Sequence, residues 1–158
     1  MKIQIKAFNE LSADELYEVL HLRNLVFVVE QNCAYLDIDH KDDQAHHVMI
    51  YDDENILIAY ARIFKPGIKY DTSSIGRVVV HPNHRGKELG DLSIRHSINA
   101  IEELYQTSEI TISAQAYLQQ FYNKHGFVCI SEEYPEDGIP HVEMRREVIK
   151  TTYIKKRL

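Results

Sequence analysis

Polar and apolar residues alternate at the start of the chain, where Ile3 and Ile5 lie between polar neighbours. This alternation is typical of a strand with one buried face. Ser12 and Glu15 then have the spacing of a capping box, in which each side chain binds the backbone N–H of the other residue. The pattern predicts a strand followed by a helix that runs from Ser12 to about residue 28.

Two apolar stretches with a short polar connection come next. Residues 46–52 and 56–64 are rich in strand-forming residues, and the three polar residues between them predict a hairpin. A third stretch, residues 75–81, contains three successive valines and ends at Pro82, which cannot continue a ladder of backbone hydrogen bonds. We expect three strands in this part of the chain.

The second half of the chain predicts a long helix and further strands. Apolar residues recur at helical spacing between residues 86 and 107, at Ile94, Ile98, Ile101 and Tyr105, so this helix should cover one face of a sheet. The remaining predicted elements are a strand at 109–114, a short helix at 116–125 that ends at Gly126, and strands at 127–134 and 141–148. This order predicts one mixed sheet packed by helices, in the α/β or α+β class.

The composition indicates one folded unit. Of 158 residues, 44% are hydrophobic and 27% are charged, which provides a sizeable core and differs from disordered or fibrous proteins. We expect a single domain over residues 1–158, with a basic tail from about residue 149. The two cysteines predict reduced thiols, and the sequence shows neither a signal peptide nor a membrane span, so we expect a cytoplasmic protein.

The charge is negative and unevenly distributed. A formal net charge of −6 argues against a general nucleic-acid binder. Residues 30–54 contain eight acidic residues and one lysine. The irregular spacing of Cys33, His40, His46 and His47 does not match a zinc site, so no metal is expected.

Residues 75–94 carry the clearest chemical signal, because a strand, a glycine-containing turn and the start of a helix coincide there. Backbone N–H groups at a helix N-terminus bind anions, and Gly86 and Gly90 allow close approach of the backbone. Arg85 and Lys87 add positive charge, so the turn predicts a phosphate site. The alternative is a plain strand-to-helix turn with solvent-facing bases. The spacing fits neither a Walker loop nor the G-x-G-x-x-G motif.

The pattern V-x-H-P-x-x-R-G-K-x-L-G, followed by FYNKHGF at residues 121–127, resembles the two acetyl-CoA motifs of the GNAT N-acetyltransferase superfamily. Longer segments resemble its ElaA-type branch: LRNLVFVVEQNCAYLDID, AYARI, IGRVVVHP, SAQAYLQQFYNKHGF and EEYPEDGIPHVEM. This likeness runs over most of the chain. It implies a GNAT fold, with a central mixed, mostly antiparallel sheet of about seven strands flanked by helices, and acetyl-CoA as co-substrate.

Position by position, the resemblance implies a cofactor site. Val78, Val79 and Val80 would present backbone groups to the acetyl and pantetheine units, and the N–H of Val78 would stabilise the oxyanion of the reaction. The pyrophosphate would be held by Arg85, Gly86, Lys87, Glu88, Leu89 and Gly90, and Gln115 completes the predicted set. The sequence departs from the superfamily pattern at Glu88, which stands where the first glycine is expected.

Tyr122 takes the position that in this superfamily commonly protonates the departing CoA thiolate. A phenol has a pKa of about 10 and a thiol of about 8.5, so a tyrosine stays protonated at neutral pH and can act as the acid. From residue type alone, the alternative is a core aromatic that packs beside Phe121 and Phe127. The motif match favours catalysis.

The general base is less defined. Many members of the superfamily have a glutamate near the start of the fourth strand, where this sequence has Ser73 and Ser74. Glu30 and His141 lie in the branch-specific motifs and are the candidate bases, and histidine has a suitable pKa near 6.5. For each of them the alternative is a solvated or structural side chain, with a base that acts through water.

The resemblance implies an N-acetyltransferase in which an amine attacks the thioester directly in a ternary complex. Because the acidic segment 30–54 borders the acceptor side in this fold, we expect a cationic acceptor, either a small molecule or a protein amine. Two alternatives stay open: a non-catalytic acyl-CoA-binding or sensing module, and an enzyme like the acyl-homoserine-lactone synthases. We expect no nucleic-acid or membrane partner, and a homodimer is left open.

Overall fold

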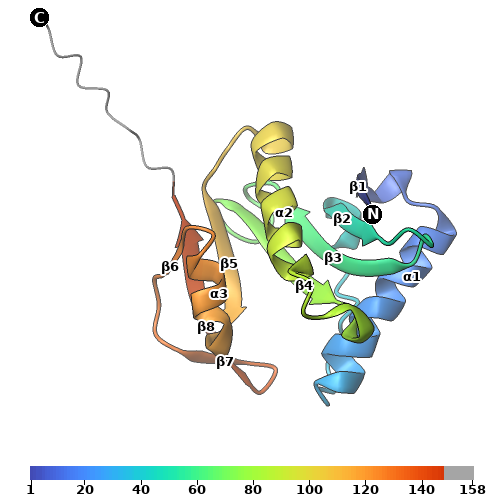
Figure 1. Ribbon diagram of the computed structural model, residues 1–158. Helices are drawn as coiled ribbons and strands as arrows, with labels where there is room; N and C mark the ends of the chain where they lie inside the picture. Colours follow the sequence, from blue (N-terminus) through green and yellow to red (C-terminus); the bar gives the residue numbers. More distant parts are fainter. Residues whose placement is uncertain (148–158) are drawn as a thin grey trace, which may run out of the picture.

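The computed structural model describes residues 1–147, so the predicted basic tail lies outside the described part of the chain. Within residues 1–147, eight strands form one sheet that is flanked by three α-helices (Figure 1). The strands are β1 (Lys2–Ala7), β2 (His46–Tyr51), β3 (Leu57–Phe64), β4 (Ser73–Val80), β5 (Ile110–Gln115), β6 (Phe127–Cys129), β7 (Tyr134–Glu136) and β8 (Ile139–Arg146). The helices are α1 (Ala13–Arg23), α2 (Leu89–Tyr105) and α3 (Gln119–Asn123). No helix in this described part is long and apolar enough to cross a membrane.

The strands lie in the order β1-β2-β3-β4-β5-β8-β6, and β7 pairs with β8. All neighbouring strands are antiparallel except β4 and β5, which are parallel. This arrangement confirms the predicted mixed, mostly antiparallel sheet flanked by helices. The described residues contain eight strands rather than about seven.

The additional strand arises in segment 127–134, for which the sequence predicts a single strand. The structure has the short strand β6 at the start of this segment and a second short strand, β7, which begins at Tyr134 and extends into the predicted loop. The two strands pair with opposite ends of β8. Asp137 and Gly138 connect β7 to β8 with φ values of +49° and +77°. Two successive positive φ values are typical of a two-residue hairpin turn. The predicted loop between the last two strands is therefore a tight hairpin.

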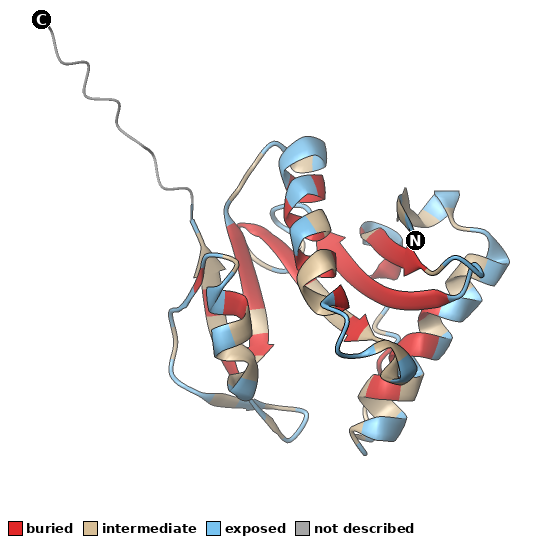
Figure 2. Ribbon diagram, in the orientation of Figure 1, coloured by how far each residue is buried: buried red, intermediate tan, exposed pale blue. Residues whose placement is uncertain are grey.

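The central strands and the sides of the helices that face them are largely buried (Figure 2). On β2, Val48 packs in the cluster that contains α2, and Met49 packs in the cluster that contains α1. Because successive side chains of a strand point to opposite faces, the two helices cover opposite faces of the sheet. The predicted stripe of α2 is buried at Ile94, Ile98 and Ile101. All residues of β3 are buried, since this strand lies between both layers.

The beginning of α1 is as predicted, and its end differs. Ser12 accepts a hydrogen bond from the N–H of Glu15 at 3.0 Å, and the Glu15 carboxylate accepts one from the N–H of Ser12 at 2.9 Å. Beyond α1, Asn24–Glu30 continues as a π-helix. The N–H of Gln31 donates to the carbonyl of Val26 at 3.0 Å, across five residues instead of four. Such wide turns often occur at functional sites.

Candidate active site

The parallel strands β4 and β5 pair at only one end. Ser73 pairs with Ile110 and Ser74 pairs with Thr111, and beyond these positions the two strands separate. A cleft of about 870 Å³ lies at the separation, lined by residues of both strands. The edge of β4 that faces this cleft has no strand partner among the described residues. Its backbone N–H and C=O groups need other partners, which a bound ligand can supply.

Strand β4 has a bulge beside the cleft. Tyr60 and Arg62 of β3 pair with Val79 and Gly76, so β4 has one more residue than β3 between these two pairs. Arg77 lies within the bulge and has a φ of +51°, a conformation that residues other than glycine rarely adopt. Bulges redirect the neighbouring backbone and are over-represented next to active sites. Val78, the residue after Arg77, lines the cleft.

Not all of the predicted cofactor-binding residues line the cleft. Those that line the cleft are Val78, Val80, Arg85, Gly90 and Gln115. Those that pack in the core are Val79, on the α1 side, and Leu89, beside β2 and β3. Those that are exposed on the turn, outside the cleft lining, are Gly86, Lys87 and Glu88. The structure thus brings part of the predicted phosphate turn to the cleft and leaves the rest facing solvent.

Glu88 has a left-handed backbone conformation, which glycine adopts without strain. It precedes α2 with φ and ψ of 59° and 25°, in the left-handed region, and its side chain makes no capping hydrogen bond. For a residue with a Cβ this conformation costs roughly 1–2 kcal/mol. The departure at Glu88 therefore preserves the turn at a cost in stability.

Glu88→Gly is expected to raise the free energy of unfolding by up to about 1 kcal/mol. The relief of left-handed strain, roughly 1–2 kcal/mol, is partly offset by the greater freedom of glycine in the unfolded chain, roughly 0.5–1 kcal/mol. Urea unfolding measures this difference. Glu88→Ala is the control, because it removes the carboxylate and keeps the strain, so it should give no gain. A less stable Glu88→Gly variant would contradict the argument.

Tyr122 is both packed and turned toward the cleft. Its ring lies 5.0 Å from that of Phe121 and 6.0 Å from that of Phe127 between centroids, in edge-to-face geometry. Burial raises the pKa of its phenol above the ordinary value of 10, so the hydroxyl keeps its proton at neutral pH. Tyr122 lines the cleft, and its hydroxyl has no hydrogen-bond partner among the described residues. The two interpretations of Tyr122 from the sequence, a core aromatic and a catalytic acid, are therefore compatible: the ring packs in the core, and the residue lines the cleft.

Glu30 lines the cleft but is paired with another predicted site residue. Arg85 donates from Nη2 to Oε1 of Glu30 at 2.6 Å. The two side chains are 47% and 40% exposed, so water screens the pair and its contribution to stability is small. A phosphate that binds Arg85 has to compete with this carboxylate.

His141 lies on β8, which pairs with β5, and it lines the cleft. Its Nδ1 is 2.7 Å from the carbonyl oxygen of Ile139, and its Nε2 is 3.1 Å from Oε2 of Glu136. Both ring nitrogens are therefore occupied by hydrogen-bond acceptors. In this geometry His141 does not offer a free lone pair to a substrate proton.

Glu136 is a cleft residue that the sequence analysis did not single out. It pairs with Ile139 across the tight turn formed by Asp137 and Gly138. The signal that could have found it is the dipeptide Asp-Gly, which is typical of two-residue hairpins. This hairpin brings the carboxylate of Glu136 next to His141.

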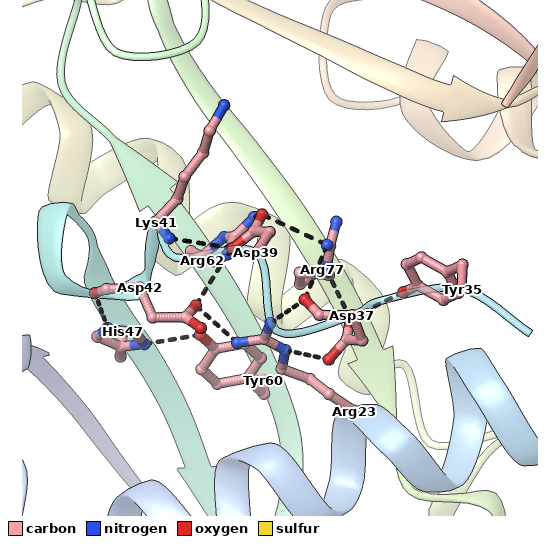
Figure 3. Close-up of polar contacts among 10 residues, drawn as sticks. All are labelled: Arg23, Tyr35, Asp37, Asp39, Lys41, Asp42, His47, Tyr60, Arg62 and Arg77. Carbon is pink, nitrogen blue, oxygen red and sulfur yellow. Dashed lines mark hydrogen bonds and ion pairs between the residues drawn. The ribbon is translucent and has the colours of Figure 1, made fainter. Parts of the chain in front are cut away.

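Three aspartates and three arginines form a network beside the cleft (Figure 3). Its ion pairs are Arg23 with Asp37 and Asp42, Arg62 with Asp39 and Asp42, and Arg77 with Asp37 and Asp39, with N–O distances from 2.7 to 3.5 Å. Arg23 and Arg62 are 0% and 3% exposed. The network fastens the loop that follows the π-helix to α1, to β3 and to the bulge of β4.

The network changes the interpretation of the acidic segment 30–54. Asp37, Asp39 and Asp42 are paired with arginines from outside the segment, and Glu30 is paired with Arg85. The cleft lining also includes five basic residues, Lys41, Arg62, Lys69, Arg77 and Arg85. Half of the eight acidic residues of the segment are therefore paired with arginines, and the cleft beside them is lined by charges of both signs.

His47 and Tyr60 close the buried end of the network. Nε2 of His47 donates to the carbonyl of Asp42 at 2.9 Å, and the Tyr60 hydroxyl lies 2.7 Å from Nδ1. Burial lowers the pKa of His47 and raises that of Tyr60, so both side chains are neutral at pH 7. Within residues 1–147, the His, Cys, Asp and Glu side chains form no group of three that could hold a metal ion.

The chain is similar to several known proteins. The family described as Acetyltransferase (GNAT) domain matches residues 8–148. Protein ElaA of Escherichia coli K12 is 43% identical over 145 residues, which cover 90% of this chain and 94% of ElaA. The crystal structure of E. coli ElaA has a TM-score of 0.86 to this structure at 38% identity, covering 92% of this chain and 99% of that one. A crystal structure of an acyl-CoA N-acyltransferase from Pseudomonas aeruginosa has a TM-score of 0.86 at 40% identity, with the same coverage.

Proposed function

Because the chain belongs to the GNAT acetyltransferase family, we propose that it transfers an acetyl group from acetyl-CoA to a primary amine. The observation that carries this proposal is the cleft where β4 and β5 separate. An extended pantetheine chain can hydrogen-bond to the unpaired edge of β4 as an added strand does. In this proposal the thioester lies beside Val78, in the cleft that Tyr122 also lines.

The turn between β4 and α2 binds the pyrophosphate in this proposal. The first N–H groups of α2 lack partners within the helix and carry its positive dipole end, which favours an anion. Arg85 adds a guanidinium at the cleft. Gly90 lies beside the ring of Phe121 in α3, and a Cβ at this position would make an ordinary contact with that ring at 3.4 Å.

The chemical step is a direct attack of the amine on the thioester. The carbonyl oxygen gains negative charge, which the backbone N–H of Val78 stabilises. As the C–S bond breaks, Tyr122 gives its proton to the sulfur. Binding both substrates in one cleft supplies a large part of the acceleration, since it replaces a bimolecular encounter by a step within the complex.

The test combines acetyl-CoA binding by calorimetry with a thiol-release assay over a panel of primary amines and lysine peptides. We expect acetyl-CoA to bind, CoA to be released only in the presence of an accepted amine, and the acetylated product to appear by mass spectrometry. Binding of acetyl-CoA with no release across the panel would favour a sensing module. Formation of an acyl-homoserine lactone from S-adenosylmethionine would favour the synthase alternative.

A further inference from the structure

A polar cluster faces the cleft from the β5, β7 and β8 side. Ser113 of β5, Glu136 of β7 and His141 of β8 all line the cleft. Oε2 of Glu136 lies 3.0 Å from Oγ of Ser113 and 3.1 Å from Nε2 of His141. The Tyr134 hydroxyl lies 2.5 Å from the same Oγ. Side chains from two other strands, Ser113 of β5 and His141 of β8, thus contact the same oxygen of the Glu136 carboxylate.

The hydrogen-bond directions in this cluster follow from what each group can donate. The carbonyl of Ile139 only accepts, so Nδ1 of His141 carries a proton and donates to it. Ser113 donates its one proton to Glu136, and Tyr134 therefore donates to Ser113. Nε2 of His141 and Oε2 of Glu136 lie 3.1 Å apart, within hydrogen-bond distance, and the imidazole donates there when it carries a proton on this nitrogen.

The second oxygen of Glu136 is available. Oε1 has no hydrogen-bond partner among residues 1–147, and the side chain is 43% exposed. Ser113 donates to Oε2 and the His141 ring lies against the same oxygen, so the orientation of the carboxylate is fixed while Oε1 can contact a ligand.

The other carboxylates of the cleft are differently placed. Glu30 is bound by Arg85, and Asp39 is bound by Arg62 and Arg77. Asp137 lies at the exposed tip of the hairpin. The guanidinium groups on Glu30 and Asp39 are always charged, whereas the imidazole beside Glu136 is charged only when protonated, so Glu136 is the cleft carboxylate best placed to receive an ammonium group.

We propose that Glu136 binds the acceptor amine through Oε1 and removes its proton, with Ser113 and His141 as positioning residues. This inference rests on the proposed acetyltransferase function. The amine arrives as an ammonium ion, gives one proton to Glu136, and Glu136 passes that proton to solvent. The free lone pair then forms the C–N bond, while the C–S bond breaks with its electron pair on sulfur.

The remaining protons balance in the same cleft. The attacking nitrogen becomes positively charged and loses a second proton, again through Glu136 to solvent. Tyr122 protonates the sulfur and regains its proton from solvent. The products are the N-acetyl amine and CoA thiol, with one net proton released.

The test compares Glu136→Gln with Glu133→Gln, which removes the same charge at an exposed position just before β7. Both are assayed for acetyl-CoA binding by calorimetry, thermal unfolding, and kcat/KM toward the alkylamine that the wild-type protein accepts best. We expect Glu136→Gln to lower kcat/KM for this amine about 100-fold or more, in the range of a lost general base. Acetyl-CoA affinity should stay within about twofold in both variants, and Glu133→Gln should retain wild-type kcat/KM.

A second comparison separates proton removal from a structural role. An arylamine is neutral at pH 7 and needs no proton removed before attack, so Glu136→Gln should lose much less kcat/KM with it than with the alkylamine. Ser113→Ala should lower kcat/KM for the alkylamine about fivefold, which corresponds to the net free energy of one hydrogen bond. The KM for acetyl-CoA should not change.

The outcomes distinguish the two proposals. If the wild-type protein transfers acetyl groups and Glu136→Gln stays within about threefold, or if it loses equal activity with both amine classes, the role of Glu136 is wrong and the proposed function stands. If the wild-type protein binds acetyl-CoA and acetylates no amine, the proposed function is wrong, and the role of Glu136 is overturned with it.

Discussion

Tyr122→Phe is expected to lower kcat about 100-fold or more while the affinity for acetyl-CoA changes by less than about twofold. The substitution removes only the hydroxyl, so the ring contacts with Phe121 and Phe127 remain. Because burial raises the pKa of this phenol, the hydroxyl is fully protonated at neutral pH and available to the leaving sulfur. Without it, the thiolate has to leave unprotonated or take a proton from water.

A thiol-release assay under saturating acetyl-CoA and amine measures this loss, and calorimetry measures acetyl-CoA binding. Tyr17→Phe is the control, since Tyr17 is 71% exposed on α1 and loses the same atom. Unchanged kcat in Tyr122→Phe would remove Tyr122 from the mechanism. A parallel loss of acetyl-CoA affinity would instead assign Tyr122 to cofactor binding.

Asp42→Asn is expected to lower the free energy of unfolding by about 3–5 kcal/mol. Oδ1 of Asp42 accepts from Arg23 at 2.7 Å and from Arg62 at 2.8 Å. Both arginines are almost completely buried, so a neutral side chain at this position leaves two buried positive charges with one carboxylate fewer. Loss of one partner from a buried ion pair typically costs about that amount.

The matched control is Asp43→Asn. Asp43 is adjacent in the same 3-10 turn and is exposed, so its substitution should change stability by less than about 0.5 kcal/mol. Urea unfolding of the three proteins gives both differences. If Asp42→Asn were as stable as Asp43→Asn, the network would contribute nothing to stability.

Much of the fold could be predicted because its signals are local. The capping box at Ser12 and the apolar stripe of α2 depend on residues three or four positions apart, and both are present in the structure. The turn after β4 was predicted from one continuous segment. The sequence shows that Glu88 stands where the superfamily pattern has a glycine, but it does not show the left-handed backbone that Glu88 adopts.

The network could not be predicted, because its partners are distant in the sequence. Arg23 and Asp37 are 14 residues apart, and Arg77 and Asp37 are 40 apart. From the sequence alone, a run of acidic residues is interpreted as a solvated surface. Here two of the three arginines that pair with it, Arg62 and Arg77, come from strands that follow the loop in the sequence. The contact between Glu136 and Ser113 was missed for the same reason, since these residues are 23 apart in the sequence and lie on different strands.

The separation of β4 and β5 has a consequence for the protein without its cofactor. After Ser74 in β4 and Thr111 in β5, the facing edges of the two strands border an open cleft instead of pairing with each other. Unpaired edges are templates on which another chain can add a strand, and natural proteins usually cover or charge them. If acetyl-CoA binds as proposed, its pantetheine arm would cover the edge of β4 and would also protect the protein from self-association.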